Sequence, residues 1–246
     1  MKIVSAVLGF SLGMISLSAG AGIHFESGPS QTALVELYTS EGCSSCPPAE
    51  ARLSRLKDDT GLWKQFVPVA YHVDYWDRLG WRDRFSSENY TARQSRYAAL
   101  WRSESVYTPA YVVDGKEWRN WSANIPSPDE QAGRLSATSA DGKDWSIDFQ
   151  PAKGGAEDWE VHAALLGTGI SSKIGAGENS GRKLEHDFVV LVQQDAPLQA
   201  KSNHAVGSLA IPPPSESAPR KAVAIWVSRR GQLTPVQATG GWLAAR

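Results

Sequence analysis

The sequence contains only two cysteines among 246 residues, and this scarcity excludes a fold stapled by many disulfides. Charge is also nearly balanced, with 25 Lys and Arg against 26 Asp and Glu, so nothing favours binding to nucleic acid or to a charged membrane surface. Beyond the N-terminus there is no apolar run long enough to span a bilayer. What is present, 41% hydrophobic residues, is enough to build a packed core.

The N-terminus has the features of a secretory signal peptide. Lys2 precedes an apolar stretch from Ile3 to about Leu17, and Ala19-Gly20-Ala21 supplies small residues for cleavage. We therefore predict a signal peptide over residues 1–21 and an exported mature chain, periplasmic or secreted, with no membrane span after cleavage. The alternative, an uncleaved anchor, is disfavoured because the apolar stretch is short and interrupted by Ser and Gly.

The order of the expected elements predicts the fold class. Strand-like apolar runs and helical spacings alternate up to about residue 138, whereas later segments alternate apolar and polar residues as half-buried strands do. We predict an α/β domain over residues 30–139 and a small all-β, antiparallel sandwich-like domain over residues 140–246. The expected elements of the first domain are strands at 33–38 and 66–76, helices at 47–57, 87–101 and 127–137, and a hairpin at 106–121.

The two cysteines lie in "TSEGCSSCPPAE", between the first expected strand and the first expected helix. A bridge between Cys43 and Cys46 would close a loop that contributes only about 2 kcal/mol, so we interpret the pair as functional. The helix N-terminus stabilises a thiolate and lowers the pKa of Cys43. Cys43 is then the exposed nucleophile and Cys46 the resolving thiol, an arrangement typical of thioredoxins.

Several segments resemble a known family. "VELYTSEGCSSCPPAE", "YHVDYWD", "YTPAYVVDG" and "GENSGRKLEHDFVV" resemble the secreted thioredoxin-like family called domain of unknown function 1223. The resemblance implies a thioredoxin-like fold followed by a β domain, and it does not settle the activity. It further implies that Thr108-Pro109 is a cis peptide that shapes the substrate groove. Glu36 is either a buried acid that relays a proton for the inner cysteine or an edge residue facing solvent.

Three functions are consistent with these patterns. The first is thiol–disulfide exchange with protein thiols or disulfides, without a cofactor, in which the chain acts as oxidant, reductant or isomerase. The second is a copper or zinc carrier that binds through Cys43, Cys46 and His72, although a lone strand histidine is more often a hydrogen-bonded core residue. The third is an interaction module in which the β domain binds a partner. The glycine-rich "GAGENSG" (175–181) lacks a phosphate-binding context, and we expect it to contact the other domain.

Overall fold

The computed structural model describes residues 22–126, 130–153 and 158–244. Strands account for 45% of the structure and helices for 13%. The predicted α/β thioredoxin-like domain followed by a small all-β domain is therefore wrong, because the fold is mostly β. In the described part of the chain, no helix is long and apolar enough to cross a membrane. The predicted signal peptide, residues 1–21, lies outside the described residues.

The described residues form two α-helices, two 3₁₀ turns and fifteen strands. The helical segments are α1 (Pro47–Ser54), which continues into a 3₁₀ turn (Arg55–Asp58), a second 3₁₀ turn (Asp77–Leu79) and α2 (Glu88–Leu100). The strands are β1 (Ile23–Glu26), β2 (Ala33–Thr39), β3 (Phe66–His72), β4 (Ala110–Val113), β5 (Lys116–Glu117), β6 (Gly133–Ser139), β7 (Asp144–Pro151), β8 (Trp159–Thr168), β9 (Ile170–Lys173), β10 (Lys183–His186), β11 (Val189–Pro197), β12 (Gln199–Lys201), β13 (His204–Ala210), β14 (Arg220–Arg229) and β15 (Pro235–Trp242).

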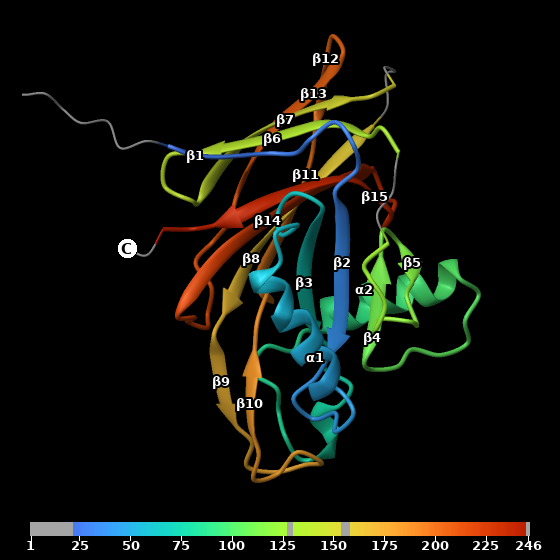
Figure 1. The fold of residues 1–246 in the computed structure, drawn as a ribbon, viewed down its shortest axis with the longest axis vertical. Coiled ribbons are helices and arrows are strands. Elements are labelled where there is room, and N and C mark those ends of the chain that lie inside the picture. The colour runs from blue at the N-terminus through green and yellow to red at the C-terminus, as the bar shows by residue number, and fades with distance from the viewer. Residues whose placement is uncertain (1–21, 127–129, 154–157, 245–246) are drawn as a thin grey trace, which may run out of the picture.

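An eight-stranded sheet runs through the molecule in the order β15-β14-β8-β11-β3-β2-β4-β5 (Figure 1). Strands from the C-terminal half thus join strands from the N-terminal half in one sheet. The junction is the parallel pairing of β11 with β3, where the backbone N–H of Ala70 donates to the carbonyl of Phe188 at 2.8 Å. This pairing satisfies an edge of β3 that the predicted α/β domain would have left open, and it explains why that prediction failed.

A second sheet of five strands, in the order β1-β6-β7-β13-β12, packs against the β14 and β8 half of the large sheet (Figure 1). The β6 and β7 strands alternate buried and exposed residues, as expected when one face of a sheet meets the core. Their inward residues, such as Leu135 and Phe149, pack with Val161, Ala163 and Ile225 of the large sheet. This half of the molecule is a sandwich with an apolar interior.

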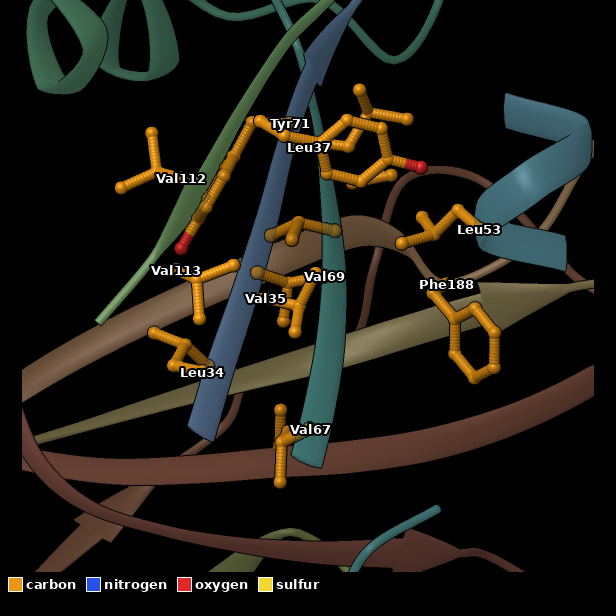
Figure 2. Close-up of a cluster of buried hydrophobic side chains, with 14 of the residues drawn as sticks. Leu34, Val35, Leu37, Leu53, Val67, Val69, Tyr71, Val112, Val113 and Phe188 are labelled. Carbon is orange, nitrogen blue, oxygen red and sulfur yellow. The ribbon is translucent and has the colours of Figure 1, made fainter. Parts of the chain in front are cut away.

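The other half of the large sheet carries the helices. All seven residues of β2 and all seven of β3 are buried, because α1 covers one face and α2 the other. Figure 2 shows the resulting core, in which side chains of the central strands, such as Val35 and Val69, lie with Leu53 of α1 and Phe188 at the start of β11. Such two-sided burial produces the continuous apolar runs that the sequence shows at these strands.

One predicted helix is wrong. Residues 133–139 form β6 instead of continuing a helix from residue 127, while residues 127–129 lie outside the described residues. Gly133 adopts φ +101°, and a Cβ there would collide with the carbonyl oxygen of Gln150 on β7. The close approach of two strands therefore decides this segment. The local pattern that predicted a helix could not show the approach of these two strands, because β7 lies farther along the chain.

Candidate functional site

Cys43 and Cys46 form a disulfide between the end of β2 and the start of α1. Cys46 is the N-cap residue, and its carbonyl accepts from the backbone N–H groups of Ala49 at 2.9 Å and Glu50 at 3.1 Å. The predicted helix N-terminus is confirmed, with Pro47 in its first turn. The predicted exposure of Cys43 is wrong, since both cysteines have a relative exposure of 0%.

The loop between β9 and β10 clamps the segment that carries Cys43. The side-chain amide of Asn179 donates to the carbonyl oxygens of Glu41 and Cys43, both at 2.9 Å. The backbone N–H of Ser44 donates to the Glu178 carboxylate at 3.1 Å. The loop "GAGENSG", expected to contact the other domain, does contact residues 41–44 of the N-terminal part of the chain. On either side of this loop, β9 and β10 pair as a two-stranded antiparallel sheet.

The Thr108–Pro109 peptide bond is cis, as the family resemblance implied. Trp76 links it to the disulfide segment. Its indole N–H donates to the Thr108 hydroxyl at 2.8 Å, and a Cβ placed on Gly42 would lie 3.0 Å from the Trp76 Cβ. Trp76 therefore stands between the residue that precedes Cys43 and the cis peptide. Pro109 is half-buried, and its predicted role in a substrate groove stays a prediction.

Glu36 is fully buried, which excludes the solvent-facing alternative. Its carboxylate accepts from the Arg93 guanidinium at 2.8 and 3.1 Å, from Tyr97 at 2.6 Å and from Tyr38 at 2.9 Å. We call these four residues the Glu36 cluster. Glu36 lies on the α2 face of β2, and among the contacts of the described residues none joins it to a cysteine. The predicted proton relay by Glu36 stays a prediction.

A second buried polar cluster lies on the α1 side of the sheet. His72 at the end of β3 pairs through Nδ1 with Asp83 at 2.6 Å. His186 at the end of β10 pairs through Nδ1 with Glu50 of α1 at 2.5 Å, and its Nε2 lies 3.3 Å from Glu41. We call these five residues the His–Glu cluster. It adjoins the disulfide along the chain, because Glu41 and Glu50 flank the two cysteines.

The charges of this cluster shift one another's pKa values. Burial opposes protonation of His186, but the carboxylates of Glu41 and Glu50 outweigh it and raise its pKa to about 10. Burial likewise opposes protonation of His72, and Asp83 raises the pKa of that imidazole overall. The pKa of Asp83 is lowered in turn, because His72 outweighs the effect of burial. The cluster therefore holds ionic groups away from water.

Glu50, His72 and His186 also form a set of metal-ligand type. In the described part of the chain they are the group whose ligand atoms all lie within 4.8 Å of one another, and neither cysteine belongs to it. The sequence indicated only His72 of the three. Glu50 had the features of a first-turn helix residue, and His186 showed no ligand spacing. These ligands come from α1, β3 and β10, so no spacing along the chain could have connected them.

The fold and the site define a class: a mostly β protein that positions a disulfide at a helix N-terminus. The chain belongs to the family described as "Protein of unknown function (DUF1223)", whose model matches residues 34–228. The family part of the sequence-based resemblance is thus confirmed, but nothing in the comparisons supports a thioredoxin-like assignment. No curated protein matches the chain.

Two solved structures are similar to this chain in fold. Protein AGR_C_4864 from Agrobacterium tumefaciens is 22% identical with a TM-score of 0.56, and the match covers 87% of this chain and 94% of that one. HBP35 of Porphyromonas gingivalis is 12% identical with a TM-score of 0.54, covering 88% of this chain and 76% of that one. At such identities the likeness concerns the fold alone.

Proposed function

We propose that this protein catalyses thiol–disulfide exchange on protein substrates after export to the periplasm or the cell exterior. One observation carries the proposal: Cys43 and Cys46 are bonded to each other at the N-terminus of α1. Free backbone N–H groups and the helix dipole at such a position favour a thiolate on release. A disulfide that closes so short a loop contributes little to stability, so we interpret this one as a reactive bond.

The proposed reaction proceeds in two balanced steps. A substrate thiolate attacks the Cys43 sulfur, forms a mixed disulfide and releases Cys46 as a thiolate, which takes up a proton. A second substrate thiolate then attacks the substrate sulfur of the mixed disulfide and releases Cys43. The substrate is oxidised to a disulfide, and the pair is reduced to two thiols. In reverse, the Cys43 thiolate attacks a substrate disulfide and Cys46 resolves it. The reduction potential sets the direction.

Access is the structural condition of this proposal. Both cysteines are fully buried, and the β9–β10 loop holds the segment through Asn179 and Glu178. A substrate thiolate reaches Cys43 only after this loop moves away. Two large hydrophobic side chains are exposed close in sequence to Trp76 and Thr108. They are Leu79, which is 50% exposed, and Tyr107, which is 41% exposed. They supply a surface on which an unfolded substrate segment would rest.

The first experiment is the reduction potential of the Cys43–Cys46 couple, measured by thiol alkylation and mass spectrometry in defined thiol–disulfide buffers. We expect a value between about −120 and −230 mV, in the range of exchange catalysts. A value below about −300 mV would mark a structural bond and contradict the proposal.

A trapping experiment tests the order of attack. Cys46→Ser leaves Cys43 free to form a mixed disulfide that nothing resolves, so substrate proteins should stay attached to it. Cys43→Ser is the matched control and should trap far less. Equal trapping by the two variants would refute the assigned roles. Partner capture that persists without either cysteine would instead support the interaction module, and cysteine-dependent metal uptake would support the carrier.

A further inference from the structure

One buried polar atom of the His–Glu cluster, Nε2 of His72, lacks any partner, and His72 is only 1% exposed. Nε2 of His186 and Oε1 of Glu41 lie 3.3 Å apart as an ion pair without a well-formed hydrogen bond. The two imidazole rings lie edge to face, with centroids 5.3 Å apart. An unpartnered buried polar atom costs about 1–3 kcal/mol, so Nε2 of His72 calls for a ligand that the protein itself does not supply.

The partnered atoms of the same side chains have the geometry that surrounds metal sites. Asp83 pairs with Nδ1 of His72, which leaves Nε2 as the nitrogen available to a ligand. The Thr39 hydroxyl donates to Glu50 Oε1 at 2.6 Å, and the Trp81 indole N–H donates to Glu41 Oε2 at 2.7 Å. His72 is therefore held through Nδ1 while its Nε2 is left for a ligand, and Glu50 and His186 are held beside it by their contact with each other.

The charges of the cluster also favour a cation. Glu41, Glu50 and Asp83 are three buried carboxylates, and two imidazoles stand against them. Two protons could balance part of this charge, but each would add an N–H donor, and His72 Nε2 has no acceptor. A divalent ion would supply the same charge and would use the lone pairs directly.

We propose that Glu50, His72 and His186 bind a divalent transition-metal ion of the zinc class, with Glu41 beside them as a further carboxylate ligand. Two imidazole nitrogens and one carboxylate oxygen form a ligand set that zinc uses, and their atoms lie within 4.8 Å of one another. The site uses neither cysteine, so it differs from a thiolate carrier and does not depend on the proposed exchange reaction.

The approach to the site affects how it would be loaded. Glu41 lines a surface hollow of about 350 Å³ whose other walls include Arg82, Arg84 and Lys173. These cations slow the entry of a metal ion into the folded protein. The loading experiment therefore includes a sample refolded from denaturant in the presence of Zn²⁺, as well as a sample incubated in the folded state.

The test is the zinc content of the desalted, oxidised full chain by mass spectrometry. We expect about one zinc ion per chain in the wild type and in the Cys43→Ser/Cys46→Ser variant. We expect at least tenfold weaker binding in Glu50→Gln and in His72→Gln. His162→Gln is the matched control, because His162 is a buried histidine whose two nitrogens already pair with Asp195 and Ser228. It should bind zinc like the wild type.

Cobalt substitution gives a second readout that needs no cluster variant. Co²⁺ in the cysteine-free variant should show visible ligand-field bands without thiolate charge-transfer absorption. A folded wild type that retains no zinc after refolding would overturn the proposal. Zinc that is lost when the cysteines are replaced would also overturn it and would favour the thiolate carrier. Circular dichroism on each variant separates loss of metal from loss of fold.

Discussion

The Glu36 cluster and the His–Glu cluster both bury carboxylates, the first between β2 and α2 and the second around α1 and the ends of β3 and β10, but the partners of these carboxylates differ. In the Glu36 cluster both oxygens of the carboxylate accept hydrogen bonds, from Arg93 and two tyrosines. In the His–Glu cluster, Nε2 of His72 is buried without a partner, and His186 and Glu41 meet at 3.3 Å without a well-formed hydrogen bond. The first cluster is complete within the chain, and the second is not.

The difference separates a structural from a functional use of buried charge. A fully partnered ion pair orders the packing of α2 on β2 and has no capacity left for a ligand. A partly satisfied cluster beside a disulfide retains that capacity at a cost in stability, which is typical of functional sites. Substitutions in and around the two clusters test this comparison.

Breaking the Glu36 cluster should cost the most. Arg93→Met leaves the Glu36 carboxylate buried without its counter-charge, and we expect the free energy of unfolding to fall by about 3–5 kcal/mol in urea denaturation. Arg96→Met on the exposed side of α2 is the control and should change it by less than about 0.5 kcal/mol. Glu36→Gln/Arg93→Met should regain part of the loss. A loss below about 1 kcal/mol in Arg93→Met would show that the pair is not structural.

Removing one carboxylate from the His–Glu cluster should cost less. In Glu50→Gln, measured with a chelator present, His186 loses one acidic partner but still lies 3.3 Å from Glu41. We expect a fall of about 1–3 kcal/mol in the free energy of unfolding. Urea denaturation of this variant beside Arg93→Met compares the clusters directly. A larger loss in Glu50→Gln than in Arg93→Met would reverse our ranking of them.

Asp114 extends the comparison to pH. Burial raises the pKa of this carboxyl to about 7, the charge of Glu36 adds to the rise, and Lys116 and the backbone N–H of Leu34 oppose it. A folded-state pKa above the unfolded value gives stability that is complete at low pH and is lost as pH rises through about 7.

Asp114→Asn mimics the neutral carboxyl, so its stability relative to the wild type should rise between pH 5 and pH 8. We expect a gain on the order of 1–2 kcal/mol after solvent screening of this half-buried group is taken into account. Urea denaturation of both proteins across that range measures it. A difference that is flat with pH would show that Asp114 is ionised throughout.

The smallest effect concerns the clamp on the disulfide segment. Asn179→Ala removes two hydrogen bonds, to the carbonyls of Glu41 and Cys43, and should speed reduction of the disulfide by dithiothreitol by roughly fivefold. Ser180→Ala on the exposed face of the same loop is the control. An unchanged rate in Asn179→Ala would mean that the loop does not limit access to Cys43.

Local patterns predicted many elements of the first half correctly. Ser87 caps α2 by accepting from the Asn89 N–H, and Asp114-Gly115 turns the β4–β5 hairpin with positive φ at both residues. Such features depend on neighbours within a few residues, which the sequence shows directly. The helix expected over residues 127–137 failed where β6 begins at Gly133, because β6 pairs with β1 and β7, which a local pattern does not include.

The sequence by itself determined the position of the cysteine pair, because a strand, a turn and a proline-started helix follow one another within a single short segment. Its apolar runs also predicted the buried strands β2 and β3, but β8 and β14, expected as half-buried strands, are buried along most of their length. Only the tertiary structure decided that β11 extends the N-terminal sheet, that Asn179 covers the disulfide segment, and that Glu50, His72 and His186 meet. The physical reason is distance along the chain. Contacts between residues more than a hundred positions apart arise from the packing of whole elements, which no local pattern encodes.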